Sequence, residues 1–367
     1  MFPVMKSASK LNGILFIALM AAMFVYSLPA VFGFAKGQTE ALGLFLDGKL
    51  LRRFEKVYDK RFFLREPSVR LWADARFMLF GEGSSGVVLG NDGWLFTNQE
   101  YLVPTDLPHN LDQQVQRIVD VQRRLREHGK ELILLPLPMK VDVYAEHARR
   151  QPDPRALGLY DSFTAELGQR GVKVSPIRAP FLAQRDASEL FVPNDTHWSP
   201  AGARLAAASF AAQQPQLVGG LAYRSQQVGE KEHKGDLLNY MLFSPDLAPQ
   251  EFHLARLPVY ETLRQQQPVS DDNLFGEQDP SILLVGTSYS KIDDWNFVGF
   301  LKEALQTDLV SIAVEARGPF QAMDEFLAGK ELQDQAIQTV IWEFPLRTLL
   351  AQREGSSLVA DDQPHHF

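Results

Sequence analysis

The sequence contains no cysteine among its 367 residues. Structural disulfides, thiolate metal ligands and a cysteine nucleophile are therefore excluded, and covalent chemistry falls to serine, threonine, lysine or a carboxylate. An excess of positive charge is also missing, since 37 Lys and Arg face 45 Asp and Glu and the net charge is -8. Nucleic acid is therefore not an expected partner. The 45% apolar and 22% charged content is that of an ordinary folded protein.

One long charge-free run is present near the N-terminus. The 25 residues between Lys10 and Lys36 carry no charge, which is enough to cross a bilayer. Lys6 and Lys10 precede the run, so the positive-inside tendency keeps the N-terminus in the cytoplasm and exports the rest. A buried core helix would carry a polar face, and this run shows none. The run exceeds a usual signal-peptide core and no clear cleavage site follows, so we predict an uncleaved anchor over residues 1–36, with a cleaved signal peptide as the alternative.

After the apolar run the sequence alternates between helical and strand patterns. A mixed-charge stretch at 42–58 is helical, and two short apolar runs around Asn91-Asp92-Gly93 predict a β-hairpin. Further helices are predicted over 111–128, 157–167, 198–213 and 295–305, and strands over 132–135, 172–174, 281–285 and 340–344. This alternation is typical of a mainly parallel sheet covered on both faces, a three-layer α/β/α sandwich.

We expect one exported domain over residues 37–353. Residues 214–280 are rich in Gln, Pro, Asp and Glu and show weak periodicity, so we interpret them as an insertion or lid on the sheet. Residues 354–367 are predicted to form a disordered tail.

A candidate nucleophile follows one of the predicted strands. Ser288 lies two residues after Gly286, directly after the strand that ends at Val285. Open α/β sheets bind their ligands at the carboxyl ends of strands, where the Ser288 hydroxyl would be presented. A serine in such a turn is also a common helix cap, so Ser288 alone is weak support for chemistry.

A candidate base lies on a separate segment. His197 is two residues after Asp195 and directly before a predicted helix. A serine nucleophile needs a base, and that base needs a carboxylate that orients its imidazole. The alternatives are that Asp195 caps the helix and His197 is a surface residue, or that both bind a metal for which no further ligand is near.

Ser288, His197 and Asp195 together form a triad hypothesis. The chain lacks the Gly-x-Ser-x-Gly elbow, and its order is Asp, His, Ser rather than the Ser, Asp, His of α/β-hydrolases. A standard lipase or esterase is therefore not expected.

These residues carry a family resemblance. Asp195-Thr196-His197-Trp198, followed about ninety residues later by Gly286-Thr287-Ser288-Tyr289-Ser290, resembles the SGNH-hydrolase-like domain of the bacterial alginate O-acetyltransferases of the AlgJ/AlgX family. The resemblance extends from residue 42 to Arg347 and is closer to the J type, which has an N-terminal membrane segment and no added carbohydrate-binding domain. Supporting segments are Gly90–Phe96, Pro138-x-Lys140 with Tyr144, Lys234–Leu237, Trp295–Phe297 and Trp342–Arg347.

The resemblance implies a three-layer fold in which the triad order is permuted relative to ordinary SGNH hydrolases. It implies that Ser288 is the nucleophile, His197 the base and Asp195 the residue that orients the base. The implied activity is periplasmic transfer of acetyl groups to hydroxyls of an exopolysaccharide, typically mannuronate residues of alginate. The implied partners are a membrane-bound O-acyltransferase that supplies acetyl, other polysaccharide acetylation proteins and the inner membrane. No cofactor and no metal are expected.

Several residues are also predicted to contact the substrate. Lys140 and Tyr144 follow a predicted strand and are candidates for holding a uronate carboxylate or a sugar ring, although they also fit solvated loop residues. Four tryptophans are candidates for a platform that stacks on sugars, although most tryptophans in such domains are core: Trp94, Trp198, Trp295 and Trp342. Trp198 and Trp295 are preferred because they flank the triad segments. The remaining candidates are the Ser288 N–H, Asn296 and Arg317 for an oxyanion and Tyr289 for the substrate.

His233 is interpreted as part of the insertion rather than as a second base. The acidic balance disfavours general attraction to a polyanion, so a local basic groove would bind the polymer. Two alternatives to acetyl transfer remain from the sequence: an acetylesterase that uses the same triad with water, and a non-catalytic scaffold of a secretion complex.

Overall fold

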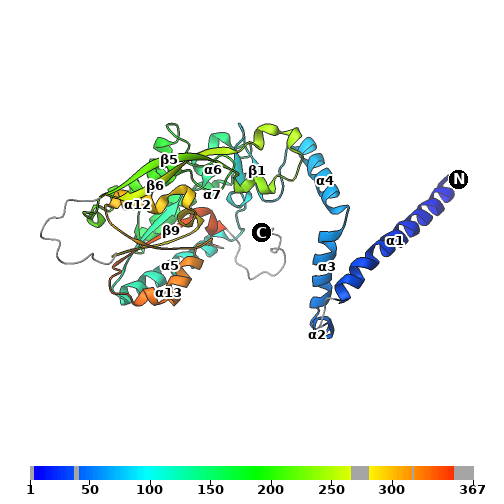
Figure 1. Cartoon of the computed structure of the whole chain (residues 1–367), viewed down its shortest axis with the longest axis horizontal. Helices are drawn as coiled ribbons and strands as arrows, with labels where there is room; N and C mark the ends of the chain where they lie inside the picture. The colour runs from blue at the N-terminus through cyan, green and yellow to red at the C-terminus, as the bar shows by residue number, and fades with distance from the viewer. Residues whose placement is uncertain (1–3, 37–40, 266–280, 316–317, 351–367) are drawn as a thin grey trace. The chain divides into compact units, whose positions relative to one another are not determined.

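The computed structural model describes residues 4–36, 41–265, 281–315 and 318–350 (Figure 1). The predicted tail at 354–367 and Arg317 lie outside the described residues. The chain divides into two compact units, Met1–Ala75 and Arg76–Phe367. The first unit therefore extends beyond the anchor that was predicted to end at residue 36.

The N-terminal unit is helical. It contains α1 (Val4–Lys36), α2 (Ala41–Leu46), α3 (Lys49–Arg61) and the first part of α4 (Arg65–Phe80). Within α1, residues Lys10–Phe34 form a helix long and apolar enough to cross a membrane. Tyr26 of α1 packs against Phe62 and Phe63, which follow α3, with ring centroids 5.8 and 4.9 Å apart. The helix predicted over 42–58 is divided in two at Gly48, whose φ of 67° is left-handed and interrupts the helix.

After the end of α4, the second unit continues with the predicted hairpin. Strands β1 (Val87–Leu89) and β2 (Leu95–Thr97) pair antiparallel, with Val88 opposite Phe96. The turn contains Asp92 and Gly93 with φ of 56° and 77°, the left-handed values that Asn-Asp-Gly favours.

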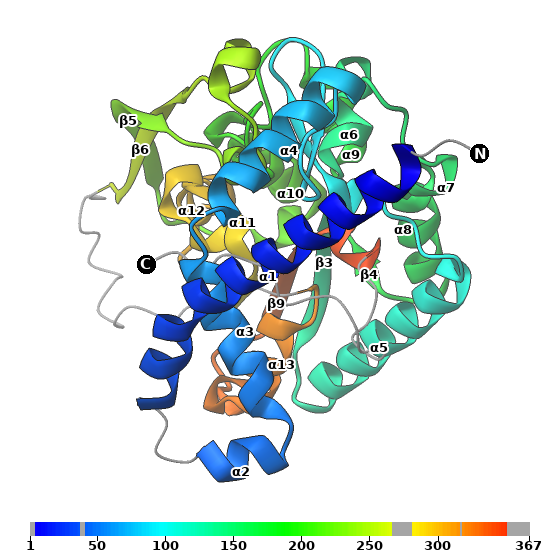
Figure 2. The ribbon, with the colours of Figure 1, turned by 90° about the vertical axis from the view of Figure 1, so that its right-hand side faces the viewer.

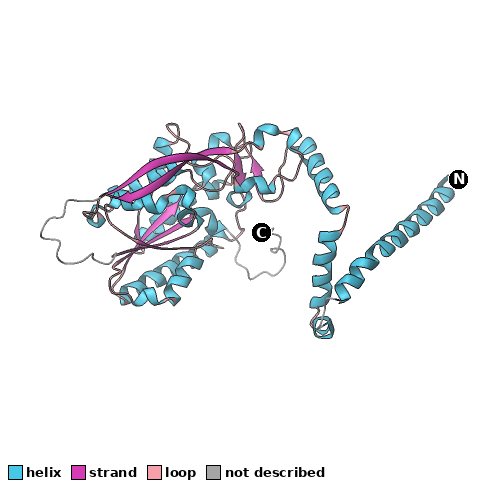
Figure 3. Ribbon diagram, viewed as in Figure 1, coloured by secondary structure: helices cyan, strands magenta, loops and turns pink. Residues whose placement is uncertain are grey.

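A five-stranded parallel sheet forms the centre of this unit (Figure 3). Its order is β4-β3-β9-β7-β8, and every neighbouring pair is parallel. The strands are β3 (Glu131–Leu137), β4 (Lys173–Val174), β7 (Ile282–Gly286), β8 (Val310–Ala313) and β9 (Thr339–Pro345). The four predicted strands are confirmed as β3, β4, β7 and β9, while β8 is short and half exposed and lacks the continuous apolar run that revealed the others. Since the strands are parallel, the chain leaves β3, β7 and β9 at one edge of the sheet.

Helices cover both faces of the sheet and confirm the predicted three-layer sandwich (Figures 1 and 2). Helices α5 (Leu107–Glu127) and α13 (Gln321–Ala328) contact the sheet strands on one face, and α10 (Pro200–Gln213) packs against α12 (Phe297–Leu305) on the other. Shorter helices are α6 (Lys140–Val143), α7 (Pro154–Leu157), α8 (Leu159–Gln169), α9 (Arg178–Gln184) and α11 (Ser288–Lys291).

The insertion contains a long antiparallel ribbon. Strands β5 (Tyr223–His233) and β6 (Ala255–Arg264) pair along their length, with His233 opposite Ala255, and residues 266–280 lie outside the described chain. Both strands contact α12, and Tyr260 meets Phe300 at 5.2 Å between ring centroids. Most β5 side chains are exposed, which explains the weak periodicity of this segment.

The sheet interior holds the second unit together. Leu283, Leu284 and Ile341 are fully buried where β7 pairs with β9. Each such side chain removes apolar surface from water and fills a closely packed interior.

We expect Leu284→Ala to lower the free energy of unfolding by about 2–5 kcal/mol, because it removes buried surface and leaves a cavity. Urea denaturation followed by tryptophan fluorescence would measure the change. Leu263 on β6 is 44% exposed and is the matched control, for which Leu263→Ala should change stability by about 0.5 kcal/mol or less. Equal effects of the two variants would contradict the assigned core.

Candidate active site

The turn after β7 presents Ser288. Thr287 caps α11, and its hydroxyl accepts a hydrogen bond from the Tyr289 N–H at 3.4 Å, so Ser288 becomes the first helical residue. Glu343 on the neighbouring strand β9 lies beneath this turn and is fully buried. Its carboxylate accepts hydrogen bonds from the Thr287 N–H at 2.9 Å, the Thr287 hydroxyl at 2.8 Å and the Ser290 hydroxyl at 2.7 Å. Glu343 therefore fixes the turn that carries Ser288.

Close packing explains the glycine before Ser288. A Cβ at Gly286 would lie 2.5 Å from the Ser290 hydroxyl and 2.9 Å from a Glu343 carboxylate oxygen. Burial raises the pKa of Glu343 from its ordinary value, although the hydrogen bonds from Thr287 and Ser290 oppose this shift.

His197 contacts Ser288 directly. The His197 Nε2 lies 2.7 Å from the Ser288 Oγ, and its Nδ1 lies 2.6 Å from the Asp195 Oδ1. Asp195 and His197 lie in the loop before α10, where the Ser199 hydroxyl accepts a hydrogen bond from the Gly202 N–H at 3.2 Å and caps the helix. The structure thus brings the three predicted residues together from two segments about ninety residues apart.

Asp195 is almost fully buried and accepts four hydrogen bonds. The Oδ1 accepts from the N–H and the Nδ1–H of His197, and the Oδ2 accepts from the His233 Nε2–H at 2.8 Å and the Asp236 N–H at 2.9 Å. Burial alone would raise the pKa of Asp195, but these hydrogen bonds hold it well below its ordinary value. Asp195 is therefore an anion that can stabilise a proton on His197.

The inserted segment supplies two groups to this cluster. His233 is the last residue of β5, and Asp236 begins the turn η4 (Asp236–Tyr240). Both Asp236 carboxylate oxygens accept from Thr196, one from its N–H at 2.8 Å and one from its hydroxyl at 2.6 Å. Burial and the charge of Asp195 raise the pKa of Asp236. Gly235 is needed between them because a Cβ there would lie 2.0 Å from the Asn194 carbonyl oxygen.

Aromatic rings enclose the imidazole of His197. Tyr289 lies 4.6 Å and Trp295 5.5 Å from it, measured between ring centroids, and Trp295 is stacked at 21°. The ring is thereby held with its two nitrogens toward Ser288 and Asp195.

A metal site is the alternative use of this cluster, because Asp236 supplies the third group that was missing from the Asp195 and His197 pair. The ligand atoms of all three lie within 4.8 Å of one another. The 2.6 Å contact between His197 and Asp195 is a direct hydrogen bond, and both Asp236 oxygens already accept from Thr196. The contacts therefore favour a hydrogen-bonded cluster, and we assign no metal to it.

Lys140 has a different role from the predicted substrate contact. Its side chain is 1% exposed, and its Nζ lies 2.7–2.9 Å from the carbonyl oxygens of Leu95, Val192, Pro193 and Asp195. Burial lowers its pKa to about 7, against the opposing charge of Glu100. The ammonium therefore fastens the loop that carries Asp195 and His197 to strand β2, and it is not available to a sugar.

Two tyrosines predicted near the substrate are also buried. The Tyr144 hydroxyl accepts a hydrogen bond from the Leu190 N–H at 2.8 Å and faces the Ser188 carbonyl oxygen. The Tyr289 hydroxyl donates to the Thr196 carbonyl oxygen and accepts from Arg347, both at 2.5 Å. Both hydroxyls therefore bind groups of the protein itself, which contradicts the predicted substrate contacts.

The other residues predicted to contact the substrate or its oxyanion are Trp198, Trp295, Asn296 and Arg317. Trp198 is 0% and Trp295 1% exposed, which contradicts a stacking platform for sugars because neither ring presents a free face. The Asn296 side chain is directed to β6, where its Nδ2 donates to the Thr262 hydroxyl at 3.0 Å. The side-chain amide of Asn296 is therefore not available to an oxyanion. Arg317 lies outside the described residues.

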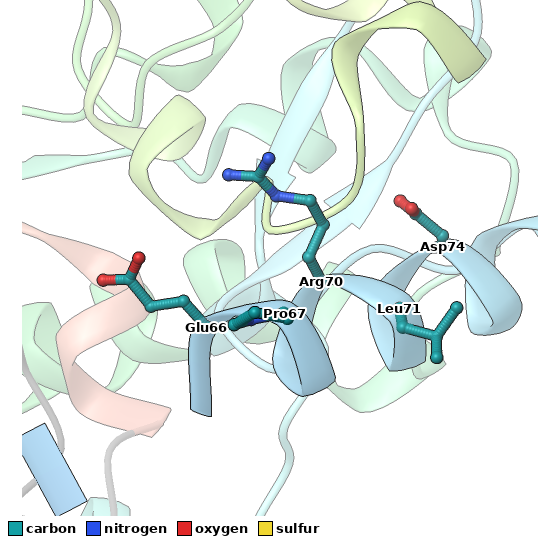
Figure 4. Close-up of a pocket in the computed structure, with 5 residues that line it drawn as sticks. All are labelled: Glu66, Pro67, Arg70, Leu71 and Asp74. Carbon is teal, nitrogen blue, oxygen red and sulfur yellow. The ribbon is translucent and has the colours of Figure 1, made fainter. Parts of the chain in front are cut away.

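The hollows on the described part of the chain include one on α4 and one next to the triad loop. The hollow on α4 is lined by Glu66, Pro67, Arg70, Leu71 and Asp74 (Figure 4), and none of the predicted site residues lines it. The other, of about 510 Å³, lies between the triad loop and the start of β6, with Asn194, Ser199 and Arg256 among its lining residues.

Sequence reasoning missed Glu343, Asp236 and the contact of His233. The His233-Lys234-Gly235-Asp236 segment was the available signal, since a glycine between charged residues indicates close backbone approach. Nothing local to Glu343 distinguishes it from a strand residue that faces solvent.

Comparison with known proteins agrees with the geometry. Residues 87–346 match the family described as SGNH hydrolase-like domain, acetyltransferase AlgX. The probable alginate O-acetylase AlgJ of Pseudomonas aeruginosa is 35% identical over 92% of this chain and 88% of its own, and that of Azotobacter vinelandii is 32% identical over 94% and 90%. The O-acetyltransferase domain of Pseudomonas putida AlgJ superposes with a TM-score of 0.65 at 30% identity, covering 75% of this chain and 95% of that domain. Pseudomonas aeruginosa AlgX, with a TM-score of 0.55 at 21% identity over 76% of this chain and 66% of its own, supports the fold.

The parallel sheet is that of an SGNH hydrolase-like acetyltransferase domain. The chain belongs to the AlgX family of SGNH hydrolase-like acetyltransferases, with the AlgJ alginate O-acetylases among its relatives. The predicted family and the predicted class of enzyme, an O-acetyltransferase, are confirmed.

We expect Lys140→Met to lower the free energy of unfolding by about 3–5 kcal/mol, because it removes a buried ammonium that donates to four carbonyl oxygens, of which, within the described residues, only those of Val192 and Pro193 also accept from a backbone N–H outside the strand pairing. Acetyl-ester turnover should fall as well, since the Asp195 carbonyl is among those released. Urea denaturation and an esterase assay would measure both. Exposed Lys330 is the control, and a Lys330→Met variant as unstable as Lys140→Met would refute the specific role.

The lowered pKa of Asp195 predicts acid sensitivity. Its ordinary value is 3.8, so the unfolded chain takes up this proton at a higher pH than the folded protein does. The stabilisation is therefore present above about pH 4 and is lost as the pH falls through the lower folded value. Against Asp195→Asn, the wild-type free energy of unfolding should fall more steeply below pH 4, by up to about 1.4 kcal/mol per pH unit. Exposed Asp186→Asn should leave the slope unchanged, and parallel curves for wild type and Asp195→Asn would contradict the assignment.

Proposed function

We propose that this protein is a periplasmic O-acetyltransferase that moves acetyl groups to hydroxyls of an exopolysaccharide, with mannuronate residues of alginate as acceptors. The 2.7 Å contact between the Ser288 Oγ and the His197 Nε2 supports this proposal most directly. The names of the AlgJ relatives support the acceptor.

Formation of an acetyl-enzyme is the first half of the proposed reaction. Asp195 is ionised, so the His197 Nδ1 carries the proton of their hydrogen bond and the Nε2 is free to accept one. The Ser288 oxygen attacks the carbonyl carbon of a donor ester while the His197 Nε2 takes its proton. The resulting imidazolium returns that proton to the leaving oxygen or sulfur of the donor, and acetyl-Ser288 remains.

Transfer to the polymer reverses these roles. A sugar hydroxyl gives its proton to the His197 Nε2 and attacks the acetyl carbon. The bond to Ser288 then breaks, and His197 returns the proton to the serine oxygen. One ester replaces another, so no cofactor or redox step is required.

Each tetrahedral intermediate needs hydrogen-bond donors for its oxyanion. The Ser288 N–H is directed to no acceptor within the described chain, whereas the Thr287 N–H is held by Glu343. Ser288 therefore supplies the backbone donor in this proposal, and a second donor comes from another group or from the bound acceptor.

The proposed location is supported by α1, and the proposed partners by the family resemblance. The span Lys10–Phe34 would anchor the protein in the inner membrane, with Ser288 on the periplasmic side. A membrane-bound O-acyltransferase would supply acetyl across that membrane, and other polysaccharide acetylation proteins would receive the modified polymer.

The proposed intermediate is directly measurable. Full-length protein in detergent is incubated with a chromogenic acetyl ester, and intact mass should increase by about 42 Da, the mass of one acetyl group. Peptide mapping should place the acetyl on Ser288. Removing a nucleophile or base typically costs several orders of magnitude in rate, so Ser288→Ala and His197→Ala should show neither adduct nor turnover.

Transfer is then distinguished from hydrolysis. Oligomannuronate should discharge acetyl-Ser288 faster than water does and should become acetylated. Exposed Ser162→Ala is the control and should behave as wild type. Discharge at an unchanged rate with no acetylated sugar would favour an esterase, and normal polymer acetylation by Ser288→Ala would favour a scaffold.

A further inference from the structure

The carboxylate of Asp195 is shared by two histidines. The His197 Nδ1 lies 2.6 Å from one oxygen, and the His233 Nε2 lies 2.8 Å from the other. Only the first contact belongs to the Ser–His–Asp arrangement. The second comes from the end of β5, a strand outside the central sheet.

We propose that His233 is a positioning residue of the acyl-transfer reaction, which holds the second oxygen of Asp195 and thereby sets how strongly Asp195 attracts a proton on His197. The proposal rests on the proposed function in that it assigns His197 as the base.

The direction of hydrogen bonding at His233 is defined by its neighbours. Asp195 is ionised and can only accept, so the His233 Nε2 carries a proton. The Nδ1 on the opposite side of the ring faces the Asp294 Oδ2 at 3.8 Å. Asp294 is also paired with Lys231, two residues before His233 on the same strand. The imidazole is therefore held between two carboxylates.

Packing fixes the ring as well. His233 is half-buried, and the edge of its ring meets Trp295 at 5.2 Å between centroids. Trp295 also stacks on His197, so a single indole contacts both imidazoles. His233 cannot turn away from Asp195 without disturbing the ring that encloses the base.

The effect on the base follows from charge. Each donor on the Oδ2 draws negative charge from the side of Asp195 that faces His197. With His233 present, Asp195 remains ionised and oriented but holds the His197 imidazolium less tightly. Without it, protonation of His197 becomes easier, and the neutral form that accepts the serine proton is lost at a higher pH. The other charged groups around His233 are Asp236, whose N–H donates to the same Oδ2, Asp294 and Lys231.

Two substitutions separate hydrogen bonding from bulk. His233→Leu removes the donor, and His233→Gln keeps an amide N–H at nearly the position of the Nε2. For turnover of a chromogenic acetyl ester by the full-length protein, His233→Leu should lower kcat/KM about tenfold on its plateau, the usual effect of losing a hydrogen bond to a charged group. The fall of kcat/KM at low pH, the acid limb of the pH profile, should move to higher pH in this variant. His233→Gln should restore the plateau to within about threefold of wild type and return the acid limb.

An exposed histidine on the same insertion provides the matched control. The His253 Nδ1 contacts the Gln250 carbonyl oxygen at 2.5 Å, and His253 does not contact Asp195. His253→Gln should retain the wild-type pH profile. A wild-type acid limb in His233→Leu, or equal losses in His233→Leu and His233→Gln with no shift in pH, would overturn the proposal and leave His233 a structural residue.

A second measurement does not depend on catalysis. NMR of protein labelled with ¹⁵N-histidine follows the Nδ1–H resonance of His197 and its titration. In His233→Leu this titration should move to higher pH, whether or not the protein forms acetyl-Ser288. An unmoved titration overturns the role of His233, whereas a moved titration without any acetyl adduct would count against the proposed function alone.

Discussion

The buried negative charge of Asp195 is the constraint around which the second unit is organised. A carboxylate withdrawn from water is costly unless donors surround it, and here four N–H groups converge on two oxygens. Two of the donors belong to His197, and two come from the insertion, through His233 and the Asp236 N–H. The loop before α10 and the end of β5 must therefore meet. The insertion completes the site rather than decorating the sheet.

Two further buried residues, Lys140 and Glu343, support the segments that carry His197 and Ser288. The Lys140 ammonium donates hydrogen bonds to carbonyl oxygens of β2 and of the loop around Asp195. The Glu343 carboxylate on β9 accepts hydrogen bonds from the turn that carries Ser288. Lys140 thus fixes the loop of the base, and Glu343 fixes the turn of the nucleophile. Lys140 follows β3 and Glu343 lies on β9. The parallel sheet therefore sets the distance between Ser288 and His197.

The sequence predicted those features that depend on local patterns. Continuous apolar runs revealed β3, β7 and β9, and a parallel sheet places the segments after these strands at one edge, which is why Ser288 could be singled out. The Asp-x-His spacing indicated His197 because both residues lie on one loop. The family resemblance added the roles that spacing alone left open.

Features that depend on distant pairing could not be predicted. His233 reaches Asp195 only because β5 pairs with β6 in one particular register, and nothing local encodes that register. Lys140 was misassigned because a lysine after a strand has the same sequence whether it faces solvent or buried carbonyls. Trp198 and Trp295 flank the triad segments as expected, but their burial follows from how α10 and α12 pack together.

The way in which Lys140 holds the triad loop also bears on how this family can vary. Its ammonium recognises main-chain oxygens, which every amino acid carries, and makes no use of the side chains of Val192 or Pro193. Lys140 therefore places no requirement on the side chains of these two residues, although the burial of Val192 restricts that position by packing, whereas the lysine has no substitute of equal length and charge. The requirement for holding the loop therefore falls on a single residue some fifty positions earlier in the chain.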